Sequence, residues 1–271
     1  MIWINGALLP ADQARIDPRD RGFTLGDGLF ETLAALDGHP LDLAAHLDRL
    51  ARASTVLDLP LPVEATEIAT AIEQVLVANG LSKGRAALRI TLSRGVGSRG
   101  LLLPLDPKPV LVITAGLHPV VPGHLEGAIV PIRRNEGSPL SRIKSLNYLD
   151  NILAQQQAQA LGAEEALMLN NQGRIAGFAR GNLLALLGNT LVTPPLTEGV
   201  LDGIVRRRIL ENAAKIGRET ADNVIEKGDI CKFRALWITN SLLGCVPITR
   251  LDGQEIPLDA ELTAELAQLV H

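Results

Sequence analysis

The chain has 271 residues, of which 46% are hydrophobic and 21% are charged, and its formal net charge is −4. This composition provides a substantial apolar core and excludes a disordered or collagen-like chain. The slightly acidic balance gives no indication of a nucleic-acid partner, and no apolar run approaches the roughly 18 residues that a membrane-spanning helix needs.

The first half of the chain alternates short apolar strands with two amphipathic helices. Asn5-Gly6 and Asp37-Gly38 are dipeptides typical of tight hairpin turns. Leucines at helical spacing follow Asp42, and the next helical run stops at Gly80. The elements predicted for this half are strands over residues 2–4, 7–9, 29–36, 85–93 and 110–114 and helices over residues 42–59 and 64–79.

A stretch rich in proline and glycine, residues 116–127, separates the two halves and predicts a linker. We expect an N-terminal domain over residues 1–117, a linker over 118–127 and a C-terminal domain over 128–271. The elements predicted for the second half are strands over residues 128–132, 166–169, 174–176, 183–187, 235–239 and 246–249, a helix that begins near Lys144, and helices over 204–216 and 259–269. Because strands and helices mix without a strict βαβ alternation, the predicted fold class is α+β with two domains.

The cellular setting is indicated by the N-terminus and the cysteines. The first residues, MIWINGALLPADQ, lack the basic region and the long apolar stretch of a signal peptide. Cys231 and Cys245 have neither a second cysteine nor histidines at zinc-ligand spacing. We therefore expect a cytoplasmic protein without a structural metal.

Two glycine-containing stretches resemble phosphate-binding turns. GVGSRG has the G-x-G-x-x-G spacing of a dinucleotide-binding turn, but prolines follow it in place of the required helix. We interpret it as a basic loop in which Arg94 and Arg99 are either plain surface or a clamp for a carboxylate. The second stretch places Gly203 before a helix that begins near Ile204, where free N–H groups and the helix dipole favour a phosphate.

Five ordered motifs resemble fold-type IV pyridoxal-phosphate enzymes, the class IV aminotransferase family: GDGLFET, HLDRL, RIKSLNYL, GVLDGIVR and TNSLLGCVPI. That group contains branched-chain and D-amino-acid aminotransferases and 4-amino-4-deoxychorismate lyase, and SRGVGSRG and IKSLNYL look most like the lyase branch. The resemblance implies a small α/β N-terminal domain and a larger C-terminal domain with a barrel-like sheet. It also implies a cofactor in the cleft between them and a homodimer that acts on a small-molecule substrate.

The resemblance turns a lysine that could be an ordinary surface charge into a candidate nucleophile. Lys144 matches the lysine that forms an imine with pyridoxal 5'-phosphate, a reaction that requires a primary amine. The same amine can then act as a general base. Tyr148 matches a residue near the phenolic oxygen of the cofactor, for which the alternative is an ordinary packed tyrosine.

Further matched residues form the implied phosphate and substrate contacts. Arg49 matches the phosphate-binding arginine, for which the alternative is a solvated helix charge. The implied co-ligands are the backbone of Ile204 and Val205 and the side chain of Ser241. The residues expected to contact the substrate are Glu31, Arg94 and Arg99.

One position departs from the family pattern. Gly177 stands where the family places a glutamate whose carboxylate keeps the pyridine nitrogen protonated, which makes the ring a strong electron sink. Gly177 and Arg180 are the expected neighbours of that nitrogen, and a cation there would favour the unprotonated pyridine. We expect a lyase of folate biosynthesis that converts 4-amino-4-deoxychorismate to 4-aminobenzoate and pyruvate. The alternatives are a D-amino-acid or branched-chain aminotransferase and, given Gly177, a non-catalytic cofactor-binding relative.

Overall fold

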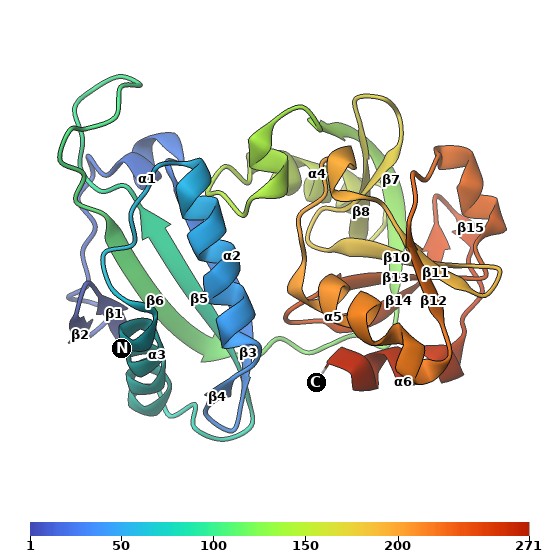
Figure 1. Cartoon of the computed structure of the whole chain (residues 1–271), viewed down its shortest axis with the longest axis horizontal. Coiled ribbons are helices and arrows are strands. Elements are labelled where there is room, and N and C mark those ends of the chain that lie inside the picture. The colour runs from blue at the N-terminus through green and yellow to red at the C-terminus, as the bar shows by residue number, and fades with distance from the viewer. Residues whose placement is uncertain (271) are drawn as a thin grey trace. The chain divides into compact units, whose positions relative to one another are not determined.

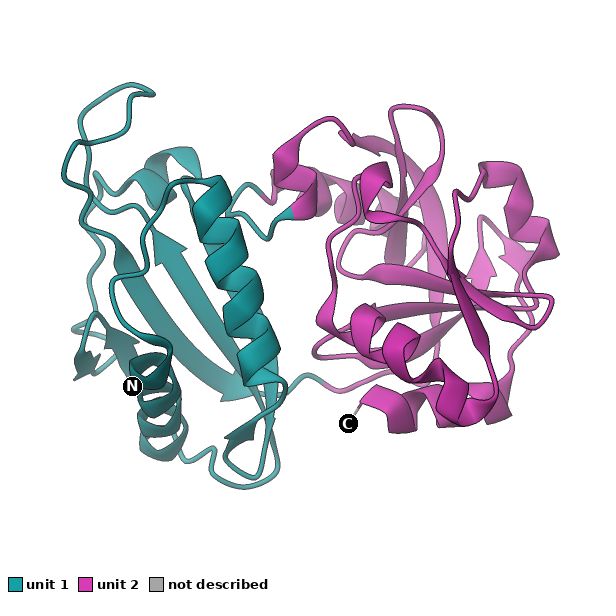
Figure 2. Ribbon diagram, in the orientation of Figure 1, with its two compact units in different colours: residues 1–119, 143–147 teal, residues 120–142, 148–271 magenta. Residues whose placement is uncertain are grey.

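A computed structural model describes residues 1–270 of the chain. It forms two compact units, coloured separately in Figure 2: Met1–Pro119 with Ile143–Asn147, and Val120–Arg142 with the residues from Tyr148 onward. This division corrects the expected domain boundaries at one place, because residues 143–147 pack on the first unit. The linker was expected over residues 118–127, but strand β7 (Leu125–Arg134) begins inside that range. The observed connection is therefore shorter than the expected one.

The first unit is one antiparallel sheet of six strands in the order β2-β1-β6-β5-β3-β4, with helices α2 and α3 packed on one face (Figure 1). Its elements are β1 (Ile2–Ile4), β2 (Ala7–Leu9), α1 (Arg21–Leu25), β3 (Gly28–Leu36), β4 (His39–Pro40), α2 (Leu43–Val56), α3 (Ala65–Ala78), β5 (Arg85–Ser93) and β6 (Val110–Leu117).

Local sequence explains most of this unit. Both turns predicted from dipeptides form, and Asn5 and Asp37 adopt positive φ angles of 42° and 48° as a tight hairpin turn requires. Along β5 every second residue, such as Leu88 and Ile90, is buried beneath the helices. The same alternation turns Arg89 toward the opposite face of the sheet.

The second unit is built on a mixed sheet of nine strands in the order β12-β11-β10-β13-β14-β7-β8-β9, with β15 paired to β14. Strands β7 and β8 pair in parallel, as do β14 with β7 and β11 with β12. Its elements after β7 are η1 (Pro139–Arg142), α4 (Leu149–Ala160), β8 (Glu165–Asn170), β9 (Ile175–Phe178), β10 (Asn182–Leu187), β11 (Thr190–Thr193), η2 (Leu196–Glu198), α5 (Ile204–Asn212), η3 (Ala213–Ile216), β12 (Glu219–Asp222), η4 (Lys227–Lys232), β13 (Ala235–Asn240), β14 (Gly244–Leu251), β15 (Gln254–Glu255) and α6 (Ala260–Val270).

Helices cover this sheet in separate groups. Helices α5 and α6 pack on it around Trp237 and Leu266, whereas α4 packs on β7 and β8 through Ala154 and Ala158. Strand β12 was not predicted because its sequence, ETAD, is polar and mostly exposed, so it carries no apolar pattern. None of the helices within residues 1–270 is long and apolar enough to span a bilayer.

Two buried threonines of this sheet provide a matched pair for a stability test. The hydroxyl of Thr193 donates to Leu183 O at 2.7 Å and accepts from Arg206 Nε, whereas the equally buried hydroxyl of Thr239 finds no partner among the described residues. An unsatisfied buried hydroxyl costs about 1–3 kcal/mol. We therefore expect Thr239→Val, which keeps the shape, to raise the free energy of unfolding by about 1 kcal/mol in a denaturant titration.

Thr193→Val should have the opposite sign and lower the free energy of unfolding by about 1–3 kcal/mol, because it leaves Leu183 O and Arg206 Nε unpaired. The two variants make the same chemical change on one sheet. A loss of stability in both would contradict the assignment of an unsatisfied hydroxyl to Thr239.

Candidate active site

Lys144 lies in a turn that leads into an isolated β-bridge at Ser145 rather than at the start of a helix, since α4 begins only at Leu149. The backbone of this segment pairs with the first residues of β3: Phe30 N donates to Lys144 O at 2.9 Å, and Leu146 N donates to Gly28 O at 2.9 Å. The half-buried Lys144 side chain places its Nζ atom 4.1 Å from the centroid of the Phe30 ring. The first unit thus holds the candidate nucleophile by main-chain hydrogen bonds and one aromatic contact.

A second cation contacts the same aromatic ring. The Arg89 guanidinium carbon lies 3.9 Å from the Phe30 centroid, and Arg89 Nε donates to the hydroxyl of Thr91 at 3.2 Å. Arg89 and Thr91 lie on the sheet face opposite the buried Leu88 and Ile90. Sequence reasoning missed Phe30 and Arg89, although the alternation of β5 already places Arg89 on that face.

On the helix-covered face, Arg49 is part of a buried charged cluster. Glu31 Oε1 accepts from Arg49 Nε at 2.8 Å, and its Oε2 accepts from Arg49 Nη2 at 2.6 Å and contacts His46 Nδ1 at 2.7 Å. Glu31 is only 1% exposed, so the structure gives it a different role from the expected substrate contact. Its carboxylate fixes the guanidinium of Arg49 in place by two parallel bonds.

The electrostatics of Glu31 follow from this cluster. Burial on its own raises the pKa of the carboxyl group, but the hydrogen bonds and charges of His46 and Arg49 outweigh burial and hold the pKa below its usual value. His46 and Arg49 are one helical turn apart on α2, so both reach the same point of β3. The helical spacing of the HLDRL motif was the signal that could have identified His46.

Arg94 is likewise a structural residue rather than an exposed clamp. It is 2% exposed, and its guanidinium donates to Asp27 Oδ2, Leu57 O and Asp58 O at 2.7–2.8 Å. Arg99, by contrast, is exposed in the irregular loop that follows β5. No helix follows that loop before β6, in agreement with the rejection of a dinucleotide-binding turn. Of these two arginines, only Arg99 is exposed and could contact a ligand.

In the second unit the start of α5 has the form of an anion site. The N-cap position is Gly203, which has no side chain to occupy the first N–H groups of the helix. A Cβ atom at Gly203 would collide with Oδ1 of Asn182, whose amide donates to Leu201 O at 2.8 Å. This close packing requires glycine at the helix start, and it leaves the N–H groups of Ile204 and Val205 suited to a phosphate.

Ser241 and Tyr148, the other matched residues of this unit, lie at element ends. Ser241 is half-buried in the turn between β13 and β14, which is shaped by the Asn240 Oδ1 atom accepting from the backbone N–H groups of Leu242 and Leu243. Tyr148 is the N-cap residue of α4 and is half-buried. Each unit therefore carries part of the matched set.

Gly177, expected to replace a glutamate, has an unusual backbone. Gly177 has a φ angle of +139°, and the pairing of β8 with β9 shifts register beside it, which indicates a bulge. Arg180 forms an ion pair with the fully buried Glu165 of β8. Burial raises the pKa of the Glu165 carboxyl group even though Arg180 lowers it. The guanidinium of Arg180 is thus already engaged with a carboxylate.

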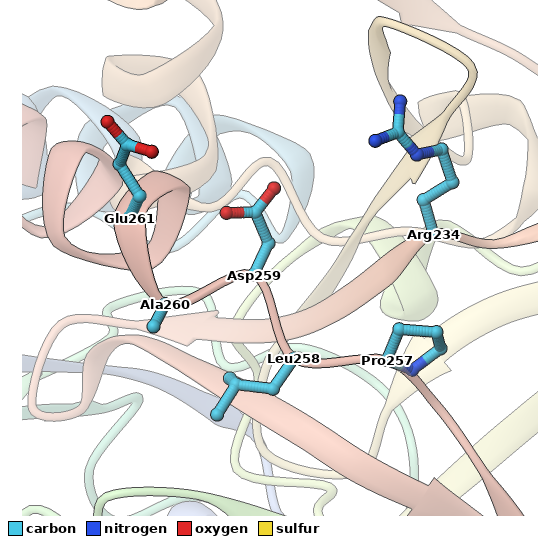
Figure 3. Close-up of a pocket in the computed structure, with 6 residues that line it drawn as sticks. All are labelled: Arg234, Pro257, Leu258, Asp259, Ala260 and Glu261. Atoms are coloured by element: carbon cyan, nitrogen blue, oxygen red, sulfur yellow. The ribbon is translucent and has the colours of Figure 1, made fainter.

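A surface pocket lies elsewhere, at the start of α6. Figure 3 shows its lining residues, Arg234 and the stretch from Pro257 to Glu261. Asp259 Oδ1 accepts from Leu262 N at 3.0 Å and so caps the helix. None of the residues matched to the family lines this pocket, and we assign no role to it.

The buried Glu31 predicts an acid-sensitive contribution to stability. Because its folded-state pKa is lowered, the contribution is fully present above the unfolded-state pKa of about 4.3 and is lost as pH falls below it. Glu31→Gln should cost about 3–5 kcal/mol at pH 7, because the buried Arg49 guanidinium loses the carboxylate charge that balances it. In urea titrations from pH 7 to pH 3, the difference from wild type should shrink below about pH 5.

The matched control is Asp48→Asn, which removes the exposed partner of Arg52 on the same helix. It should change the free energy of unfolding by less than about 1 kcal/mol. A pH-independent difference between Glu31→Gln and wild type would contradict the charged pairing of Glu31.

Comparison with known proteins places these features in a family. A family model described as amino-transferase class IV matches residues 28–251. Aminodeoxychorismate lyase from Bacillus subtilis (strain 168) is 33% identical over 254 residues, which cover 93% of this chain and 87% of the lyase. D-alanine aminotransferase from Bacillus licheniformis is 25% identical over 258 residues, which cover 94% of this chain and 89% of that enzyme.

The fold agrees with this assignment. The structure of a branched-chain aminotransferase from Thermoproteus uzoniensis superimposes with a TM-score of 0.92 at 24% identity and covers 98% of this chain and 92% of that chain. The expected α+β architecture of fold-type IV is therefore confirmed. With the match of the family model across both units, the chain belongs to the class IV aminotransferase family.

Proposed function

We propose that this chain is a pyridoxal-phosphate-dependent 4-amino-4-deoxychorismate lyase that yields 4-aminobenzoate and pyruvate for folate biosynthesis. The observation that carries the proposal is its 33% identity to an aminodeoxychorismate lyase across 93% of the chain. The fixed position of Lys144 beside Phe30 and the open start of α5 support it, because they supply an amine and an anion site.

Residues of each unit, taken by itself, have the chemistry that the cofactor requires. The groups that would bind the phosphate are the N–H groups of Ile204 and Val205, the Ser241 hydroxyl and the Arg49 guanidinium. Lys144 would hold the cofactor covalently. When bound, pyridoxal phosphate supplies an aldehyde for the substrate amine and a ring that withdraws electrons from it. The Glu31 contact keeps the Arg49 guanidinium oriented, which lowers the entropic cost of binding the phosphate.

Lys144 is the base of the proposed reaction. Its Nζ atom takes the proton from the ring carbon that bears the substrate amino group. The C–O bond between the neighbouring ring carbon and the enolpyruvyl group then breaks, and the substrate ring becomes aromatic. The released enolpyruvyl group accepts a proton at its methylene carbon and leaves as pyruvate. All atoms of the substrate appear in the two products, and no external oxidant or reductant is needed.

Arg89 is suited to orient the substrate in this reaction. It lies on the same Phe30 ring as Lys144, and its guanidinium is held by that ring and by Thr91. The substrate carries two carboxylates, and a planar guanidinium binds a carboxylate by two parallel hydrogen bonds. The exposed Arg99 is a further candidate for the second carboxylate.

Position 177 favours a lyase over an aminotransferase. Gly177 lacks a carboxylate, and its φ angle of +139° disfavours any residue that has a side chain. A weaker electron sink affects a lyase less, because aromatisation of the ring provides much of the driving force. The second candidate is an aminotransferase for D- or branched-chain amino acids, supported by relatives such as the D-alanine aminotransferase.

The proposed enzyme is a homodimer in the cytoplasm. The loop after β5 supports the dimer, because Leu101, Leu102 and Leu105 are almost fully exposed on it. Apolar side chains clustered in this way commonly mark a surface that a protein partner covers. Sedimentation of the purified protein tests the dimer directly.

The proposed reaction is tested by product analysis. Purified protein loaded with pyridoxal phosphate should release 4-aminobenzoate and pyruvate in equal amounts from 4-amino-4-deoxychorismate. Lys144→Ala should reduce kcat at least about 10³-fold, since it removes the base, and should leave only reversible cofactor binding. Borohydride reduction of the loaded wild type should label the peptide that contains Lys144.

Exchange of an amino group with a keto acid, without 4-aminobenzoate, would support the aminotransferase instead. Cofactor binding without turnover in either assay would indicate the non-catalytic relative. A label on any other lysine, such as Lys83 or Lys232, would refute the role of Lys144.

The phosphate role of Arg49 is tested by a pair of variants on α2. Arg49→Ala should weaken cofactor binding by about 2–4 kcal/mol, because a partly buried, charge-assisted contact is lost. Arg52→Ala changes an arginine that pairs with Asp48 on the exposed side of the same helix and should leave cofactor binding unchanged. Fluorescence titration of the two apoproteins measures the difference, and equal affinities would refute the assignment.

A further inference from the structure

The segment that carries Lys144 depends on one short stretch of β3 and its preceding turn. Within the described part of the second half of the chain, only residues 143–147 belong to the first unit. Three hydrogen bonds attach them to residues 26–30: Phe30 N to Lys144 O, Leu146 N to Gly28 O, and Asn147 Nδ2 to Gly26 O, each at 2.9 Å. The position of Lys144 is therefore set by the position of that stretch.

Glycines in this stretch make room for the segment. A Cβ atom at Gly28 would lie 2.3 Å from Leu92 O of β5 and 2.7 Å from Cδ1 of Leu146, and one at Gly26 would lie 2.8 Å from Oδ1 of Asn147. Gly26 also has a φ angle of +67°, a conformation that side chains disfavour. The GDG sequence thus acts as a receptor for the segment 143–147.

Asp27, between the two glycines, fixes the receptor from inside. Its Oδ2 atom accepts from Arg21 Nε and from Arg94 Nε, both at 2.8 Å, and its backbone carbonyl accepts from Arg94 N at 3.1 Å. Arg94 is bonded in turn to Leu57 O and Asp58 O at the end of α2. Asp27 therefore couples the receptor to the helical layer of the unit. Although burial raises the pKa of its carboxyl group, the two arginines outweigh burial and lower the pKa.

We propose that Asp27 and Asn147 are positioning residues for Lys144, Asp27 by fixing the receptor and Asn147 by attaching the lysine segment to it. Neither side chain needs to touch substrate or cofactor. The consequence for catalysis rests on the proposed function, in which Lys144 is the reacting amine. The attachment itself is a property of the cofactor-free first unit.

Hydrogen exchange of the cofactor-free protein tests the attachment. Asn147→Ala removes one exposed hydrogen bond and no buried group, so the protein should fold normally. Hydrogen exchange at the Leu146 and Phe30 amides should become about 10-fold faster, because one supporting hydrogen bond is lost. The exchange rate of the Ile72 amide in α3 should stay unchanged. Asp27→Asn should have the same local effect or a larger one.

The matched control is Asn79→Ala, which removes a half-buried side-chain amide that donates to backbone carbonyls of the first unit. It should leave exchange at Leu146 and Phe30 unchanged. The inference is overturned if Asn147→Ala and Asp27→Asn leave those two amides as in wild type, or if exchange rises equally at Ile72.

A kinetic arm connects the attachment to catalysis. In Asn147→Ala, kcat should fall about 10-fold with little change in KM, and the pH profile of kcat should shift, because a displaced base changes the proton transfer rather than substrate binding. Asn147→Gln keeps a donor and should recover part of kcat. A kcat that is unchanged in Asn147→Ala, in a wild type that turns over substrate, would overturn the inference. A wild type that forms no bond between Lys144 and pyridoxal phosphate refutes the proposed function alone, since the exchange result is independent of it.

Discussion

Main-chain pairing between the Lys144 segment and the start of β3 is the interaction on which the candidate site depends. A lysine side chain is long and flexible, so a reactive position for its amine requires a fixed backbone. The hydrogen bonds of Lys144 O and Leu146 N provide it by pairing the loop that carries Lys144 with the first residues of β3. The Phe30 ring then restricts the amine from the side.

Two carboxylates of the first unit, the half-buried Asp27 and the buried Glu31, hold the parts of the site together. Asp27 and Glu31 flank the strand residues that receive the lysine segment, and each is paired with arginine. A buried charge pair adds little net stability, but it tolerates the loss of either partner poorly. Its value here is positional, because Glu31 orients Arg49 on one face of β3 while the residues next to it hold Lys144. One strand thereby fixes both the Arg49 guanidinium and the backbone of the Lys144 segment.

The sequence predicted the features that local patterns determine and missed those that depend on distant partners. Turn dipeptides and apolar alternation located β5 at its observed bounds, because each signal lies within the element itself. Lys144 was expected at the start of a helix, yet residues 26–30, more than a hundred positions away, hold its segment outside α4 by main-chain hydrogen bonds. Likewise, Glu31 and Arg94 read as ligands in isolation, and only the fold supplies the partners that engage them. The resemblance to the family supplied the site residues that spacing alone did not.

Gly177 shows why the missing carboxylate is more than a change of side chain. A strand residue with a glutamate has a negative φ angle, whereas Gly177 combines φ of +139° with a register shift against β8. Glutamate at this position would strain the backbone before it could act on a ligand. Arg180 would attract the introduced carboxylate only weakly, because its guanidinium already pairs with Glu165. The local backbone has thus adapted to glycine, and a reaction driven by aromatisation is the chemistry of this family that needs the absent group least.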